Sequence, residues 1–405
     1  MSISQIAREI REPATLRLTE AARLLRERGE PVIHLGAGEP KSKAPIDAIL
    51  SSAAQLQSAE VRYTPTEGIP PLVKAIIRYM EENYGKVVSP EQVMVFTGAK
   101  QAIYSLMVAI LSPQDEVVIA APHWVSYPEI TKMVYGKPVV IVPEDGGFIP
   151  TFKEFTEACS SYTKAIMINS PNNPSGAVYP AELIAELVEF CERKGIYLIM
   201  DDIYHRLTFD GVRSPNAYEY TTKDIDDSRV IVVNGVSKAY AMTGFRIGWT
   251  VASRKLTRAM VNIAAQNFSC PSVIDQTAAA GALTGVQTGV ESLRLMLENN
   301  RNVMVNELQA FTGVKLTKPM GTFYCFPDFS AYSRDSIKLS ELLLEKALVV
   351  TVPGVEFGFE GYLRLSFCGS VKDITEGIAR IKWVLDPDSP NEIFIGDRKL
   401  KRDWL

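Results

Sequence analysis

Short apolar runs alternate along most of this chain with amphipathic stretches of helical length. The stretch 181–193, between two of these runs, has the spacing of an amphipathic helix. Strands that alternate with helices are typical of a mostly parallel sheet covered by helices on both faces. We therefore expect an α/β fold with a seven-stranded, mostly parallel sheet. Its predicted strands are 93–97, 116–120, 139–142, 165–169, 197–201, 230–234 and 247–252.

The pattern changes after these runs, which predicts a second and smaller unit. A long helical stretch covers 291–311, and the apolar segments that follow (322–326, 348–352, 362–367) are separated by helices. We expect a large domain at 45–290 and a smaller α+β domain at 291–385. An N-terminal segment, 1–44, is expected to pack with the small domain. Residues 386–405, rich in proline and charge, are predicted to be a tail.

The overall composition excludes several classes of function. The 405 residues carry a net charge of −4 and a pI near 5.7, so no electrostatic footprint for DNA or RNA is present. No apolar run is long enough to span a bilayer, and the N-terminus has no secretory h-region. Five cysteines without a C-x-x-C pair and three histidines without metal-ligand spacing predict neither disulfides nor a metal site. A small-molecule enzyme of the cytoplasm fits these observations.

The most informative motif lies where one predicted strand ends. Residues 234–248 read Asn-Gly-Val-Ser-Lys-Ala-Tyr-Ala-Met-Thr-Gly-Phe-Arg-Ile-Gly, with Lys238 just past the strand. Ligands of parallel sheets bind beyond the carboxyl ends of the strands. A lysine there is either a solvated surface residue or a desolvated amine suited to Schiff-base chemistry. Ser237 and Arg246 could both hold a phosphate, and this favours the second interpretation.

From this motif the chain resembles the class I/II aminotransferases of pyridoxal 5′-phosphate (PLP) fold type I. The likeness runs from about Thr15 to about Leu385 and is closest to the bacterial aspartate aminotransferase branch. It implies that Lys238 holds PLP as a Schiff base and then moves the Cα proton of the substrate. Asp201, at the end of a strand, matches the aspartate that pairs with the pyridine nitrogen. An aspartate after a strand can instead cap a helix, and that interpretation fits Asp202 better.

Other residues acquire expected roles from the same resemblance. Asn173 matches the asparagine that bonds the 3′ oxygen of the ring, with Tyr204 as its partner, and Trp124 matches the aromatic residue that stacks on the ring. Gly98, Ala99 and Lys100 form a small-residue turn into a helix, which favours phosphate binding through free backbone N–H groups.

The resemblance also implies contacts with the substrate and with a second subunit. Arg364 matches the arginine that grips the α-carboxylate in two-pronged fashion, and Gly38 would let the backbone approach the substrate. We expect Lys100, helped by Thr15, to bind the distal carboxylate of a dicarboxylic substrate, which Trp124 and Asn173 also contact. Tyr63 matches the tyrosine that reaches the phosphate of the other subunit in a homodimer with shared active sites.

The predicted reaction moves an amino group between an L-amino acid, aspartate or glutamate, and a 2-oxo acid such as 2-oxoglutarate. The alternatives are another amino donor, such as alanine or an aromatic amino acid, or a PLP-dependent lyase on the same fold. Residues 41–45 (Lys-Ser-Lys-Ala-Pro) depart from the family pattern beside the substrate entrance. A regulator that keeps the fold without activity would carry a basic DNA-binding domain. A nicotinamide dehydrogenase would need a G-x-G-x-x-G turn, which the sequence lacks.

Overall fold

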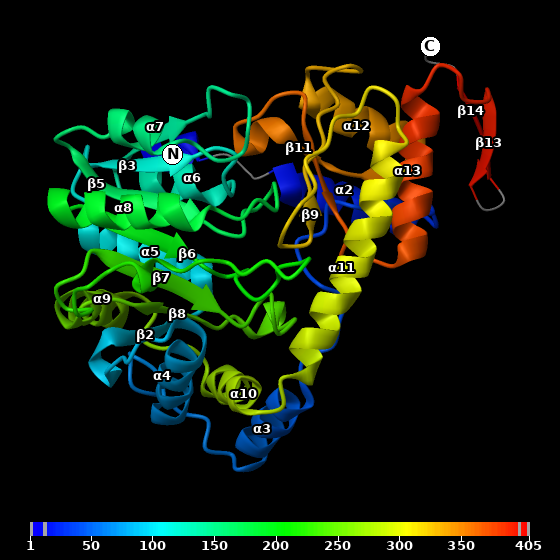
Figure 1. Cartoon of the computed structure of the whole chain (residues 1–405). Helices are drawn as coiled ribbons and strands as arrows, with labels where there is room; N and C mark the ends of the chain where they lie inside the picture. Colours follow the sequence, from blue (N-terminus) through cyan, green and yellow to red (C-terminus); the bar gives the residue numbers. More distant parts are fainter. Residues whose placement is uncertain (1–2, 11–13, 396–397, 403–405) are drawn as a thin grey trace.

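A computed structural model of the chain describes residues 3–10, 14–395 and 398–402 (Figure 1). Its α-helices are α1 (Gln5–Glu9), α2 (Ala14–Glu27), α3 (Ile46–Gln57), α4 (Pro70–Tyr84), α5 (Ala99–Ile110), α6 (Ser126–Met133), α7 (Phe152–Ala158), α8 (Ala181–Lys194), α9 (Arg254–Asn267), α10 (Val273–Thr284), α11 (Thr288–Gln309), α12 (Ser336–Ala347) and α13 (Val371–Leu385). Short 3-10 helices occupy Pro90–Gln92, Ala217–Glu219, Thr243–Phe245 and Gly354–Phe357. No helix among the described residues is long and apolar enough to cross a membrane.

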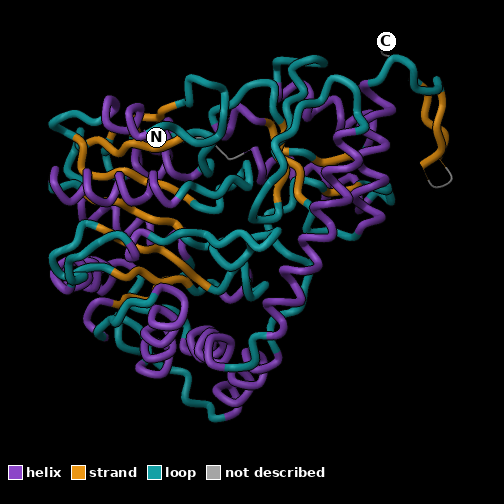
Figure 2. Tube along the Cα trace, viewed as in Figure 1, coloured by secondary structure: helices purple, strands orange, loops and turns teal. Residues whose placement is uncertain are grey.

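The predicted seven-stranded sheet is confirmed. Its strands lie in the order β2-β8-β7-β6-β5-β3-β4, and β8 is antiparallel to both of its neighbours while the other pairs are parallel. Figure 2 shows the strands in orange with helices, in purple, around them. Every strand predicted from an apolar run corresponds to one strand of this sheet. They are β2 (Val93–Phe96), β3 (Glu116–Ala120), β4 (Lys137–Ile141), β5 (Thr163–Asn169), β6 (Tyr197–Asp201), β7 (Val230–Gly235) and β8 (Gly248–Val251).

Helices cover both faces of this sheet, which explains why its inner strands are apolar throughout. Successive side chains of a strand point to opposite faces. On β3, Val117 and Ile119 join a core with α5, α6 and α9, whereas Val118 joins a core with α4, α8 and α10. The helices thus form a layer on each side of the sheet, as Figure 1 shows.

The helix α8 illustrates how the sequence builds this layer. Leu183, Leu187 and Cys191 recur every four residues, so they lie on one face, and all three are buried. The helix ends at Gly195, whose φ of 73° is in the left-handed region that glycine adopts without strain. The chain then enters β6, which carries Asp201 at its carboxyl end.

The smaller part of the structure is built from short strands and long helices. The strands β9 (Tyr324–Cys325), β11 (Val352–Pro353) and β12 (Leu363–Ser366) form an antiparallel sheet, and β1 (Ile33–His34) pairs in parallel with β10 (Val349–Val350). The N-terminal segment therefore contacts this part of the molecule, while α11 runs from beside α3 and α10 up to α13 (Figure 1). The domain boundaries at 44, 290 and 385 stay predictions.

The last residues, predicted as a tail, contain a β-hairpin. Its strands are β13 (Glu392–Ile395) and β14 (Arg398–Lys401), paired antiparallel. Ile395 is buried, and the indole Nε1 of Trp383 on α13 donates a hydrogen bond of 2.8 Å to the carbonyl oxygen of Pro390. The hairpin is thus attached to the helix that precedes it.

Candidate active site at the carboxyl ends of the strands

Lys238 lies three residues beyond β7, at the edge of the sheet predicted to bind ligands. Its Nζ donates a 2.7 Å hydrogen bond to the carbonyl oxygen of Gly38 and lies 5.8 Å and 5.7 Å from the ring centres of Tyr204 and Phe323. Burial and the positive charge of Arg364 lower the pKa of Lys238 to about 8. About a tenth of this amine is therefore neutral and nucleophilic at pH 7, far more than for an ordinary lysine.

Asp201 ends the neighbouring strand β6 and is only 4% exposed. Its Oδ2 accepts a 2.6 Å hydrogen bond from the hydroxyl of Tyr127, and its Oδ1 accepts one of 3.3 Å from the backbone N–H of Ile203. Burial raises the pKa of Asp201 to about 6, against the opposing effects of Tyr127, Ile203 and Lys238. A carboxylate in this setting suits a cationic ring nitrogen, because that partner would offset the cost of burying the charge.

Asn173 and Tyr204 lie between these groups and the small part of the molecule. Asn173 follows β5, and its backbone N–H donates a 2.8 Å hydrogen bond to Oδ1 of Asn169. Asn169 in turn donates a 2.7 Å hydrogen bond to the backbone oxygen of Asp201, so the ends of β5 and β6 are joined. The hydroxyls of Tyr204 and Tyr324 lie 3.4 Å apart. The backbone of Asn173 is thus fixed at the end of β5, and the hydroxyl of Tyr204 lies against Tyr324 of the small part.

Arg364 enters the site from β12 and is 4% exposed. Its Nη1 donates to Oδ1 of Asn173 at 3.0 Å, and its Nη2 donates to the carbonyl oxygen of Gly36 at 3.1 Å. The guanidinium lies 4.3 Å from the ring centre of Tyr324 and 5.1 Å from that of Phe357. Its Nε has no hydrogen-bond partner among the described residues. A buried guanidinium with unused donors can bind a carboxylate.

A third part of the site surrounds the start of α5. Gly98 precedes this helix with φ of 86°, a conformation that favours glycine, and a Cβ atom there would lie 2.5 Å from Nη2 of Arg246. Gly248 is equally constrained, because its Cβ would lie 2.4 Å from the backbone nitrogen of Ala99. The side chain of Ser237 is buried beside Lys238. The arginine and the free N–H groups of the helix start make an anion-binding cradle.

Lys100 and Trp124 complete this side. The Nζ of Lys100 lies 4.8 Å from the ring centre of Trp124, a cation–π contact. Lys100 is exposed on one side, while partial desolvation and the positive charge of Arg246 lower its pKa. The site thus gathers four cationic side chains, whose mutual repulsion an anion would relieve. A ligand with a phosphate, a cationic ring nitrogen and an aldehyde for an amine fits these residues, as PLP does.

The structure leaves one predicted site residue, Tyr63, apart from this cluster, and it does not describe the side chain of a second, Thr15. Tyr63 is 92% exposed and is not buried against any other part of its own chain. Thr15 belongs to α2, but its side chain lies outside the described residues. Gly38 lies in the site through its contact with Lys238, and a Cβ there would meet only the Tyr324 hydroxyl at 3.6 Å.

Several neighbours of the site escaped the sequence analysis. Tyr127 bonds Asp201 and packs edge-on against Trp124 at 5.4 Å, and Tyr324 contacts both Tyr204 and Arg364. Tyr127 lies only three residues after Trp124, in the turn that opens α6, and this proximity was the only signal. Nothing near Tyr324 in the sequence indicated its contacts.

The interpretation of Asp202 as a helix cap is wrong. The residues after it form turns and no helix begins there. The Oδ2 of Asp202 instead accepts a 3.0 Å hydrogen bond from the hydroxyl of Tyr84 on α4. The turn that follows brings Tyr204 to the same side as Asp201.

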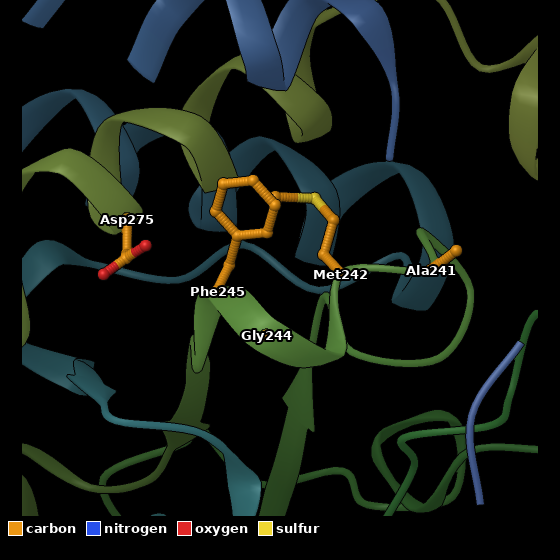
Figure 3. A pocket seen from close by; sticks show the side chains of 5 residues that line it. All are labelled: Ala241, Met242, Gly244, Phe245 and Asp275. Atoms are coloured by element: carbon orange, nitrogen blue, oxygen red, sulfur yellow. The ribbon is translucent and has the colours of Figure 1, made fainter. Parts of the chain in front are cut away.

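A pocket lies next to this site, between the loop after Lys238 and the start of α10 (Figure 3). Its lining residues are Ala241, Met242, Gly244, Phe245 and Asp275. Figure 3 shows the Phe245 ring beside the Met242 side chain and Asp275 across from them. Because this pocket contains none of the cationic side chains described above, we place the reaction at Lys238 and not here.

Comparisons with known proteins agree with this geometry. The family model of aminotransferase class I and II matches residues 30–381. The aspartate aminotransferase of Geobacillus stearothermophilus is 35% identical over 387 residues, with 94% of this chain and 98% of that protein covered. A probable aspartate/prephenate aminotransferase of Aquifex aeolicus is 37% identical over 380 residues, with coverage of 92% and 95%.

The fold agrees as well. The crystal structure of the aspartate aminotransferase from Rhizobium meliloti matches with a TM-score of 0.90 at 33% identity, covering 95% of this chain and 99% of that one. The structure of the Thermus thermophilus aspartate aminotransferase with maleate matches with a TM-score of 0.89 at 33% identity, with coverage of 94% and 99%. The chain therefore belongs to the class I and II aminotransferases and is a PLP-dependent aminotransferase of fold type I.

Proposed function

We propose that this enzyme transfers the amino group of a dicarboxylic amino acid, aspartate or glutamate, to a 2-oxo acid such as 2-oxoglutarate. The observation that carries the proposal is that cationic groups flank Lys238 from two sides. Arg364 lies on one side, and Lys100 and Arg246 lie on the other. A substrate with two carboxylates needs two such groups once the cofactor phosphate has taken a third.

The names of relatives support the same choice. Relatives from Geobacillus stearothermophilus, Bacillus subtilis and Rhizobium meliloti are aspartate aminotransferases, and the structure from Thermus thermophilus was determined with maleate, a dicarboxylate. Two further names, from Aquifex aeolicus and Thermus thermophilus, add prephenate, so prephenate belongs in any panel of acceptors.

We assign the cofactor to the residues around the ends of β5, β6 and β7. Lys238 would hold PLP covalently, and Asp201 would pair with its ring nitrogen. Asn173 and Tyr204 would bond the ring oxygen, and Trp124 would stack on the ring. The phosphate would be held by the free backbone N–H groups of the turn Gly98, Ala99 and Lys100 and by the side chains of Ser237 and Arg246, which leaves the Lys100 ammonium group for the substrate. When bound, PLP supplies a conjugated ring that accepts the electron pair released at the substrate Cα.

The residues of the chain then have distinct tasks. Arg364 would orient every substrate by its α-carboxylate. Gly38 would let the backbone approach the substrate closely on one side of the site. Lys238, once its amine is free and neutral, would act as the general base that moves the Cα proton of the substrate. Lys100 would bind the distal carboxylate, with Thr15 as a second contact. Because Lys100 would bind this second carboxylate, it would be the main residue that determines which substrate the enzyme accepts.

We also propose a homodimer with shared active sites in a reducing cytoplasm. Tyr63 is 92% exposed and would reach the phosphate of the partner subunit. The helix α3, before it in the chain, carries the exposed apolar side chains Ile46, Ile49, Leu50 and Leu56, which a partner would cover. All five cysteines are free, and a reducing compartment would keep them so.

The test is a screen of amino donors against 2-oxoglutarate, oxaloacetate, pyruvate and prephenate. We expect aspartate and glutamate to have the highest kcat/KM, with stoichiometric exchange of the amino group. Release of ammonia or pyruvate without an acceptor would identify a lyase instead. Equal or better turnover of alanine or an aromatic donor would contradict the dicarboxylic assignment while leaving the aminotransferase reaction intact.

A further inference from the structure

Two adjacent aspartates are both buried at the end of β6 but face different surroundings. Asp201 is 4% exposed and Asp202 is 1% exposed. Their carboxylates have different partners, because Tyr127 on α6 bonds the first and Tyr84 on α4 bonds the second. Two carboxylates this close and this buried repel each other strongly if both are ionised.

The partners of the two carboxylates are unequal. Asp201 accepts hydrogen bonds on both oxygens and feels the positive charge of Lys238. Asp202 accepts one hydrogen bond on Oδ2, and its Oδ1 is buried with no hydrogen-bond partner among the described residues. An ionised carboxylate with so little support is costly to bury. The negative charge therefore belongs on Asp201.

Among the described residues, no cationic group bonds the carboxyl group of Asp202. Burial lowers the pKa of His205 to about 4, so its ring is neutral near pH 7. Its Nδ1 lies 2.9 Å from the backbone oxygen of Asp202 and 3.2 Å from the amide nitrogen of Asn234, and its Nε2 lies 2.8 Å from the hydroxyl of Tyr79. The guanidinium of Arg206 bonds Tyr240 instead.

The same contacts connect Asp202 to the frame of the active site. The amide of Asn234, on β7, donates a 2.9 Å hydrogen bond to the hydroxyl of Tyr84, which donates to Asp202. Asn234 lies four residues before Lys238, and Asp202 and His205 directly follow Asp201 and Tyr204 in sequence. The titratable and charged groups around Asp202 are Asp201, Tyr84, Tyr79, His205, Tyr218 and Arg206.

We propose that Asp202 carries a proton in the folded enzyme and acts as a neutral positioning residue for residues 201–205, leaving Asp201 as the single negative charge beneath the cofactor. This inference rests on the proposed cofactor contacts of Asp201 and Tyr204. It agrees with the effect of burial, which raises the pKa of Asp202 to about 8, assisted by the negative charge of Asp201. At neutral pH most molecules would therefore have a neutral Asp202.

The proton is tested directly by infrared spectroscopy on the full-length, PLP-loaded enzyme with ¹³C-labelled aspartate. We expect a band from a protonated carboxylic acid at pH 6 to 7 that is present in the wild type, lost in Asp202→Asn and kept in Asp201→Asn. If the wild type and Asp202→Asn have the same band, Asp202 is ionised and the proposal is overturned.

Stability gives an independent readout. A carboxyl group whose pKa is raised on folding stabilises the protein at low pH, and that contribution is lost as pH rises toward the folded pKa. Between about pH 4 and pH 8 the unfolding midpoint of Asp202→Asn should therefore rise relative to that of the wild type, and above pH 8 the difference between the two midpoints should stay constant. A difference that does not change with pH would contradict the proposal.

The positioning role is tested by comparing two substitutions of Asp202. Asparagine keeps the shape and can still accept from Tyr84, so Asp202→Asn should retain the affinity for PLP. Asp202→Ala removes that acceptor, and we expect PLP to bind about tenfold more weakly, as for one lost hydrogen bond. Equal affinities would refute positioning. Should Asp202→Ala fail to fold, weak PLP binding by Asp202→Asn would refute it. An unchanged cofactor spectrum in Asp201→Asn would instead disprove the assignment of Asp201, whatever Asp202 does.

Discussion

Arg364→Lys separates recognition of the α-carboxylate from recognition of the side chain. In the structure Arg364 uses two donors to hold Asn173 and Gly36, at 3.0 Å and 3.1 Å, and its other donors remain for a substrate. A lysine has one compact ammonium group and cannot bond Asn173, Gly36 and a substrate carboxylate at the same time. Losing one charge-assisted hydrogen bond costs ~1.5–3 kcal/mol, or a ~10–150-fold lower kcat/KM.

The assay is steady-state kinetics with aspartate, glutamate and alanine as donors. Because every donor has the α-carboxylate, we expect kcat/KM to fall by a similar factor for all three. Arg301→Lys is the matched control, since Arg301 is also fully buried but bonds Asp210 on a different part of the fold. The control should lower stability and leave kcat/KM nearly unchanged. A loss confined to aspartate and glutamate would show that Arg364 binds the side chain and would refute our assignment.

Three further predictions concern Lys238 and Lys100. Lys238→Ala should fold but lack the absorption of covalently bound PLP, and its half-reaction with aspartate should slow by several orders of magnitude; normal turnover would disprove its role. Lys100→Leu should lower kcat/KM for aspartate by ~10–100-fold and leave alanine nearly unaffected; an equal loss for both would make Lys100 a cofactor ligand. The rate at which the apoenzyme takes up PLP should rise with pH with a midpoint near pH 8, where half of the Lys238 amine is neutral; a midpoint near the ordinary lysine pKa would contradict the effect of burial.

The large sheet could be predicted because its strands carry their signal locally. A strand buried on both faces is a short apolar run between polar turns, as at β6, where the predicted and observed bounds agree. The first and last residues of the strands in the smaller part are harder to predict from the sequence. β9 and β11 have two residues each, so too few side chains lie on one face to give a period. Their pairing with β12 depends on contacts distant in the sequence.

The residues of the site also differ in whether a local sequence pattern predicts them. Lys238 and Asp201 have strong local motifs, and their surroundings agree with the family resemblance. Tyr127 and Tyr84 bond the two aspartates from 74 and 118 residues away, a separation that no local pattern reports. The helix-cap interpretation of Asp202 failed for this reason, since local propensity competed with a distant partner and lost.

The direction of β8 explains why one cationic residue breaks the rule that ligands meet the carboxyl ends of strands. Arg246 precedes β8, so in an all-parallel sheet it would lie at the opposite edge from Lys238. β8 runs antiparallel to β7 and β2, and its first residue, Gly248, pairs with Gly235 and Phe96 at the ends of those strands. The reversal carries Arg246 against Gly98 and into the anion cradle. A single antiparallel strand therefore lets one short loop, 236–247, supply both the amine and the arginine of the site.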